Sequence, residues 1–250
     1  MKPDRLKPIS LAFLILSAFA QPSGAEILVS ETFSYADGDK LDNQDGGTGW
    51  TGPWFVHKGQ VDTTFEKGRL IVNSKTNSGY SKRTINITAP QNGVLYLCVD
   101  LDNQHLPQNP FSVALRTEQG TKNLIVVGQG AGRKYWGVYV TGRGWANTQE
   151  PSYAEAKPQR LVLAIDYTSR QVRLYMNPDF SAAEPSNAAD AVVSDLDMET
   201  LTAFGCVHLV TMNSNPDLIN EPRIYDNLFI TDSWADFATI SDLKASPESK

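Results

Sequence analysis

The sequence predicts an all-β protein in which two antiparallel sheets pack face to face as a jelly-roll sandwich. The first observation is a series of about twelve short runs in which apolar and polar residues alternate, as they do in half-buried strands. The second is the turn chemistry between the runs, such as Lys67-Gly68 and Asn92-Gly93. The third is the near absence of helical periodicity in 250 residues of ordinary globular composition, 41% hydrophobic and 20% charged. Short strands with frequent turns are typical of sandwiches.

The expected strands follow one another closely along the chain. They span residues 27–33, 61–65, 69–74, 82–87, 94–101, 111–117, 123–128, 135–141, 160–167, 171–176, 206–212 and 223–231. Residues 182–201, rich in Ala, Ser and Asp, predict an excursion with one helical turn. Because no linker and no internal repeat interrupts the series, we expect one domain over residues 26–240 and a disordered tail over 241–250.

Residues 1–25 have the pattern of a secretory signal peptide. Its parts are three basic residues (Lys2, Arg5 and Lys7), an apolar run (9–20) and a small-x-small cleavage site (23–25, with 18–20 as the alternative). The apolar run is shorter than the roughly 20 residues that cross a bilayer. We therefore expect a secreted or periplasmic protein without a membrane span.

The charge balance limits the class of partner. Removal of the first 25 residues takes away three basic residues and one acidic residue, so the formal charge changes from −6 to −8. Nucleic acid is excluded as a partner, because phosphate binding needs clustered Lys and Arg, and no such cluster occurs in the sequence. Neutral glycans, cations and other proteins fit this charge better.

Alternation within the strands sorts their residues into two faces. In 94–101 the leucines and Val99 form a core face and leave Tyr96, Cys98 and Asp100 on the other. The same parity collects a mixed aromatic and polar set on one concave face: Tyr96, Asp100, Arg116, Tyr135, Tyr139, Tyr175 and His208. Aromatic rings stack on sugars, so this set predicts a site for a polysaccharide or glycoconjugate. Trp145, in a glycine-rich segment expected to be a flexible loop, either joins the site or packs on its own loop.

Cys98 and Cys206 are the two cysteines of the chain. An oxidising compartment favours a disulfide between them, and both also lie in apolar strand patterns where buried free thiols are common. Their shared parity makes a bridge feasible if their strands are neighbours. The sequence leaves the bridged and free forms open.

Residues 31–54 are rich in glycine and end in two tryptophans, Trp50 and Trp54, which form either a plug at one end of the core or a ligand surface. The pattern Phe33-x-Tyr35-x-x-Gly38-x-x-Leu41, followed by Gly46-Gly47-x-Gly49-Trp50-x-Gly52-x-Trp54, resembles the start of secreted proteins common in planctomycetes and verrucomicrobia. Residues 223–236 resemble their final strand and turn. The resemblance implies a concanavalin A-like (laminin G-like) jelly-roll domain, and a fold of this kind does not specify an activity.

Two enzyme classes built on this sandwich provide alternatives. Laminarinase-like glycoside hydrolases carry paired carboxylates alternating on one strand, about 5 Å apart, and no strand here has them; the nearest pair, Asp100 and Asp102, stands at a strand end. Jelly-roll polysaccharide lyases use a His, a Tyr and an Arg, and His208, Tyr139 and Arg116 have those types and parities. The other two histidines, His57 and His105, lack metal-ligand spacing.

A structural calcium ion is a further expectation from the resemblance. Sandwich carbohydrate-binding modules often hold calcium between the first and last strands, and Glu31, Asp37, Asp39 and Asp226 stand in similar places. Alternatively, Asp37 and Asp39 only shape an Asx turn. Asp226 shares the parity of the aliphatic residues in the final strand, so we expect it to be buried near residues 31–38.

The sequence therefore predicts a secreted, non-catalytic glycan-binding or extracellular matrix or surface module. The alternative is a polysaccharide lyase or glycoside hydrolase acting on the concave face. A purely structural surface protein is the third class.

Overall fold

The computed structural model describes residues 26–57, 61–74, 79–103, 110–117, 119–151, 158–185, 189–212 and 222–240. Its strands are β1 (Ile27–Glu31), β2 (Phe55–Val56), β3 (Val61–Glu66), β4 (Arg69–Ser74), β5 (Gly79–Thr88), β6 (Val94–Asp102), β7 (Phe111–Arg116), β8 (Asn123–Gln129), β9 (Tyr135–Val140), β10 (Gly144–Pro151), β11 (Gln159–Asp166), β12 (Gln171–Met176), β13 (Ala191–Val193), β14 (Ala203–Thr211) and β15 (Arg223–Thr231). A 3₁₀ turn, η1 (Met198–Leu201), and a short helix, α1 (Trp234–Phe237), complete the elements.

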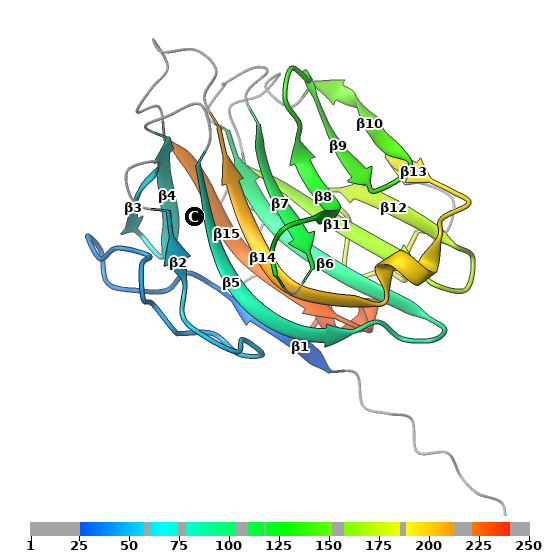
Figure 1. The fold of residues 1–250 in the computed structure, drawn as a ribbon, viewed down its shortest axis with the longest axis horizontal. Coiled ribbons are helices and arrows are strands. Elements are labelled where there is room, and N and C mark those ends of the chain that lie inside the picture. The colour runs from blue at the N-terminus through cyan, green and yellow to red at the C-terminus, as the bar shows by residue number, and fades with distance from the viewer. Residues whose placement is uncertain are drawn as a thin grey trace, which may run out of the picture.

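The strands form two antiparallel sheets that lie one in front of the other (Figure 1). The eight-stranded sheet has the order β13-β12-β11-β6-β15-β4-β3, with β1 paired to β15 beside β4. The seven-stranded sheet has the order β10-β9-β8-β7-β14-β5-β2. The predicted all-β sandwich of two antiparallel sheets is confirmed, as is the adjacency of the first and last strands.

The main core fills the space between the two sheets. The apolar face predicted for β6 contributes to it through Leu95, Leu97, Val99 and Leu101. A second, smaller apolar cluster lies on the outer side of the eight-stranded sheet, where Trp234 and Phe237 of α1 cover Cys98 and its neighbours. One sheet is thus covered on both sides by apolar packing, which matches the near-continuous hydrophobic character of β11.

The glycine-rich segment before β2 is organised by a buried ion pair. Glu31 of β1 accepts hydrogen bonds from Arg83 Nη1 (2.9 Å), Trp54 Nε1 (3.1 Å), Tyr35 Oη (3.0 Å) and the amide of Phe33 (2.9 Å). Arg83 also donates to the carbonyls of Gly46 and Gly52 and lies over the Trp50 ring. Trp54 is buried and Trp50 half-buried against the core, so the plug alternative for the two tryptophans is the one that holds.

Three strands were missing from the sequence prediction: β2, β10 and β13. β10 replaces the flexible loop expected around Trp145. It pairs with β9 and carries mostly small and polar residues, so the sequence pattern did not indicate a strand.

The helical turn expected within 182–201 is confirmed by η1. In the described part of the chain, no helix is long and apolar enough to cross a bilayer.

Candidate functional site

The outer face of the seven-stranded sheet carries one continuous row of residues that crosses all seven strands. The register places in this row, from β2 to β10, Phe55, Lys82, His208, Ala114, Val126, Tyr139 and Trp145. Large aromatic and basic side chains stand toward both ends, and small ones occupy the middle. Residues opposite one another in a sheet share a face, so this row is a surface built from strands distant in sequence.

The neighbouring row of residues on the same face also has small residues in its middle. It runs through Tyr80, Val210, Ser112, Gly128, Gly137 and Asn147. Gly128 has φ +134°, and a Cβ there would lie 2.5 Å from the Phe111 carbonyl oxygen. A Cβ on Gly137 would lie 2.5 Å from the carbonyl oxygen of Ala146. Backbone crowding therefore keeps side chains off the central floor of this face.

An aromatic group stands at the β2 end. The Tyr80 ring stacks on His208, with centroids 4.9 Å apart and planes at 16°, and His57 lies 5.2 Å from Tyr80. Phe55 is 48% exposed, and Lys82 Nζ lies 5.3 Å from its ring centroid. An exposed phenyl ring beside a cation suits contact with the apolar face of a ligand ring.

A second aromatic group stands at the β10 end. Tyr139 and Trp145 have ring centroids 5.8 Å apart, and the Arg133 guanidinium lies 5.4 Å from the Trp145 ring. Trp145 packs on the backbone of Gly130, where a Cβ would come within 2.5 Å of the indole. Tyr135, at the start of β9, is 37% exposed. The structure places Trp145 on the same face as Tyr139, and contacts with the β8–β9 turn hold its ring there.

His208 and Arg116 form the centre of the face. Arg116 Nη1 donates to His208 Nδ1 at 2.9 Å, so the neutral ring carries its proton on Nε2. Only 2% of His208 is exposed, because the β7–β8 turn lies over it; a Cβ on Gly120 would be 3.2 Å from Nε2. In Figure 1 this turn crosses in front of β14. Burial, together with the positive charges of Arg116 and Lys82, lowers the pKa of His208 to about 3.

These contacts bear on the two catalytic alternatives. Glycoside hydrolysis needs two carboxyl groups, yet the strands of this sheet contain a single acidic residue, Glu150 at the end of β10. A lyase base needs a free lone pair near the substrate, whereas His208 uses Nδ1 to accept from Arg116 and holds its other nitrogen under Gly120. The described strands thus offer aromatic and cationic contacts without an evident acid-base pair.

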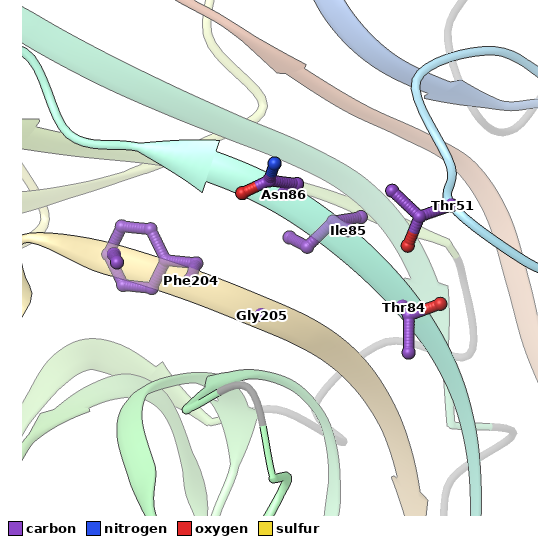
Figure 2. A pocket seen from close by; sticks show the side chains of 7 residues that line it. Thr51, Thr84, Ile85, Asn86, Phe204 and Gly205 are labelled. Atoms are coloured by element: carbon purple, nitrogen blue, oxygen red, sulfur yellow. The ribbon is translucent and has the colours of Figure 1, made fainter.

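A pocket of about 380 Å³ continues this face along β5, past Thr84, the cross-strand neighbour of Cys206. Figure 2 shows Thr84 and Asn86 on β5, Phe204 and Gly205 on β14 beside it, and Thr51 on a loop that approaches β5. Hydroxyl and amide groups here can reach the hydroxyls of a ligand. The sequence analysis missed this pocket, although Thr84 and Asn86 share the outward parity of Lys82.

Three of the predicted ligand-binding residues lie elsewhere. Tyr96, Asp100 and Tyr175 belong to β6 and β12 of the eight-stranded sheet, so the prediction that they share a face with Tyr135 and Tyr139 was wrong. Both tyrosines donate to Glu184, at 2.5 and 2.9 Å, and pack against Trp234. Burial raises the pKa of Tyr175 to about 12. The alternation within a strand shows which of its residues point away from the core, but it does not show which of the two sheets the strand belongs to.

Asp100 is occupied by a buried ion pair. Arg160 donates to both of its carboxylate oxygens at 2.8 Å, and Asn227 Nδ2 donates to one at 2.7 Å. The bidentate geometry holds Arg160 in its charged form, and hydrogen bonding to Asp100 raises the pKa of Arg160 against the effect of burial. Asp100 is therefore a structural residue.

Asp226 is buried, as predicted, but faces the opposite way from the prediction. Tyr225 and Leu228 both point into the main core, because Asn227 adopts φ +50° and the register shifts between Asp226 and Phe229. This irregularity turns Asp226 outward, opposite Asp100 in the register and within the electrostatic reach of Arg160. The parity argument failed because it assumed an unbroken strand.

The four predicted calcium ligands do not gather at one point. Glu31 is saturated by the donors around Arg83, Asp37 Oδ1 accepts from the amide of Lys67 at 2.8 Å, and Asp39 is exposed. In the described ranges no three His, Cys, Asp or Glu residues are grouped to hold a metal ion. Calcium binding stays a prediction from sequence; a rise in melting temperature with calcium over chelator would support it.

Both cysteines are free, so the bridged alternative is excluded. Cys98 lies under α1 outside the eight-stranded sheet, and Cys206 lies outside the seven-stranded sheet, where its Sγ donates to the Thr117 carbonyl. Their parities match, but the outer faces of the two sheets point in opposite directions. Burial raises the pKa of both thiols.

Several solved structures resemble this sandwich. A glycosyl hydrolase family 16 protein from Mycobacterium smegmatis has a TM-score of 0.52 at 10% identity, covering 82% of this chain and 100% of that one. A beta-1,3-glucanase from Mycobacterium marinum has a TM-score of 0.52 at 11% identity, covering 83% and 99%. The binding domain of botulinum neurotoxin serotype C1 has a TM-score of 0.51 at 8% identity, covering 82% and 52%.

These likenesses show a concanavalin A-like sandwich, a fold shared by glycoside hydrolases and binding domains. No family model matches the sequence, and no curated protein does.

Proposed function

We propose that this protein is a secreted, non-catalytic module that binds a polysaccharide or glycoconjugate along the outer face of the seven-stranded sheet. The observation that carries the proposal is the row from Phe55 to Trp145, with aromatic groups near both ends and a floor of small residues between them. An extended sugar chain lying across the strands could stack rings on both groups at once. The resemblance of residues 31–54 and 223–236 to secreted proteins with a concanavalin A-like domain supports the secreted part of this proposal.

Binding can be tested by titrating polysaccharides into the mature protein in a calorimeter. We expect Phe55→Ala and Trp145→Ala each to weaken binding about fivefold or more, the effect of losing an interface residue that contributes over 1 kcal/mol. Val192→Ala is the matched control, since Val192 is an exposed apolar residue (45%) on β13 of the other sheet. Binding that is insensitive to both aromatic variants would contradict the proposed face.

The enzymatic alternative has its own test. Incubation with the same polysaccharides should release neither reducing ends nor unsaturated sugars. Release that disappears in Tyr139→Phe would favour a lyase or hydrolase instead.

Export from the cytoplasm is a separate part of the proposal, supported by the basic and apolar pattern of residues 1–25. Expression of the full chain with its own N-terminus should place the protein in the periplasm or medium. Its mass should correspond to a chain that starts at Glu26, or at Gln21 if the alternative site is cut. A protein that retains residues 1–25 in the cytoplasm would contradict this part.

A further inference from the structure

The basic residues on the outer face of the seven-stranded sheet have different contacts from those on the outer face of the eight-stranded sheet. Lys82 and Arg116 stand on either side of His208, on the strands that flank β14. Within the described residues neither has a carboxylate partner: Lys82 lies over Phe55, and Arg116 donates to His208. By contrast, Arg160 and Arg173 of the eight-stranded sheet each pair with an Asp or Glu.

The centre of this face also holds donors that lack acceptors. His208 Nε2 and Arg116 Nε are buried and have no hydrogen-bond partner. His208 is only 2% exposed, so its unpartnered N–H belongs to a desolvated site rather than to a mobile surface chain. Buried donors without acceptors cost free energy. Gly120 lies over His208 Nε2, so the half-buried Arg116 is the member of this pair that an acceptor from a ligand can reach.

The local field is positive although the protein as a whole is negative. Among the described residues, the groups that face His208 are Lys82 and Tyr80 from β5, Arg116 from β7, Cys206 from its own strand and Gly120 from the β7–β8 turn. Burial lowers the pKa of His208, and the positive charges of Arg116 and Lys82 lower it further. Burial raises the pKa of Cys206, and the same two charges act in the opposite direction, as a positive field does. The formal charge of the chain is −6, so any attraction of an anion to this face comes from the local charges of Lys82 and Arg116 and not from the charge of the whole chain.

We infer that the ligand is an acidic polysaccharide, one whose carboxylate or sulfate groups bind between Lys82 and Arg116 while its sugar rings lie on the aromatic groups of the row. This inference rests on the proposed glycan-binding function and specifies its substrate class. The Arg116 guanidinium, fixed by His208, presents N–H donors in a planar arrangement that matches a carboxylate or sulfate. Lys82 supplies a second, more flexible charge across β14.

The test uses pairs of polymers that share a backbone and differ in charge. Polygalacturonate is compared with its fully methyl-esterified form, and dextran sulfate with dextran, by calorimetric titration of the mature protein. We expect binding to the charged member of at least one pair, at least tenfold tighter than to its neutral partner and weakened by added salt. The pair that shows the preference identifies carboxylate or sulfate as the recognised group.

Variants locate the charge recognition. Lys82→Gln and Arg116→Gln should each weaken binding of the charged polymer at least fivefold, and Lys67→Gln, a lysine with a 71% exposed side chain in the β3–β4 turn, should leave it unchanged. If Arg116→Gln fails to fold, Lys82→Gln carries the test, because Lys82 makes no ion pair in the described structure. Equal binding of charged and neutral polymers would overturn this inference and leave the proposed function standing. Binding of none of the four, nor of any neutral glycan, would overturn both.

Discussion

The two outer faces of this sandwich are built from strands with the same alternation of apolar and polar residues, but they differ in how far the rest of the chain covers them. Outside the eight-stranded sheet, α1 covers an apolar cluster, and the charges at its margins are paired, as in Asp100 with Arg160 and Arg173 with Glu184. Outside the seven-stranded sheet, Phe55 is exposed, and Lys82 lacks a carboxylate partner among the described residues. One face is covered by a segment of the chain and has its charges paired, and the other leaves an aromatic ring exposed and a lysine without a carboxylate partner among the described residues.

This difference shows that alternation alone cannot separate an open face from a covered one. Tyr96 and Tyr139 have the same parity in their strands, yet Tyr96 is 5% exposed beneath Trp234 and Tyr139 remains half-buried on an open face. What decides between them is a segment distant in sequence, residues 233–240, that folds over one sheet. Mutations should therefore affect stability on one side and binding on the other.

The largest expected effect is on the covered face. Asp100→Asn removes the negative partner of buried Arg160 and should lower the free energy of unfolding by about 3–5 kcal/mol. Urea denaturation measures it, with Asp62→Asn as control, because the Lys40–Asp62 pair is exposed and contributes less than about 1 kcal/mol. A loss no larger than the control's would show that this face is not held by its ion pair.

The next effect tests the centre of the open face through pH. The folded pKa of His208 is lowered to about 3 from an ordinary value of about 6.5. As the pH falls below 6.5, the unfolded state gains a proton that the folded ring does not take. Stability is therefore lost on acidification, by about 2 kcal/mol at pH 5 relative to pH 7.

Urea denaturation between pH 7 and pH 5 should show this loss in the natural protein and a much smaller one in His208→Gln. The slope that remains in the variant would come from the other titrating groups of the protein. Identical pH profiles for the two proteins would mean that His208 is solvated and titrates normally.

A smaller loss is expected at Asp226, beside the Asp100–Arg160 pair. Asp226→Ala removes a buried carboxylate whose Oδ1 accepts from the amide of Asn227 at 2.9 Å, and should cost more than about 1 kcal/mol of stability. The melting temperatures of the natural protein and of Asp226→Ala, measured with and without calcium, test whether Asp226 binds the metal. A calcium-dependent rise in the natural protein that is absent from the variant would restore a metal role; unchanged stability would show that Asp226 is dispensable.

The smallest effect on stability is expected at Lys82, one of the two basic residues proposed to bind the ligand. Lys82→Gln changes a half-buried side chain without a carboxylate partner among the described residues, so the free energy of unfolding should change by less than about 0.5 kcal/mol. Chemical denaturation of the same sample used for ligand titration measures it. A clear destabilisation would mean that Lys82 is a structural residue, and the contrast between the two faces would be weaker.

Much of the fold was accessible from the sequence because it depends on local patterns. Period-two alternation located most strands, and the leucines of β6 point into the core as predicted. The Glu31–Arg83 pair was missed although its signal was present: Arg83 has the parity of Ile85 and Ile87, and a charge in a core position requires a partner.

The rest depends on information that strand patterns do not contain. The outward turn of Asp226 follows from the positive φ of Asn227, which a regular alternation cannot reveal. The sequence analysis correctly grouped Arg116, Tyr135, Tyr139 and His208 on one face of the seven-stranded sheet, whereas it left the place of Trp145 open because β10 was not predicted. Tyr96, Asp100 and Tyr175 were added to it in error, because sheet membership is a property of the whole topology.

The pairing of β1 with β15 has a consequence for how the chain reaches this structure. Thr231 Oγ1 donates to the carbonyl of Glu26 across a separation of 205 residues, and β15 also lies between β4 and β6 in the sheet. Closing so long a loop is entropically costly, and folds dominated by such contacts form slowly. During synthesis, β4 and β6 therefore keep unpaired edges until residues 223–231 are available. A chain truncated before β15 would expose those edges to other molecules and would be prone to aggregate rather than to fold in part.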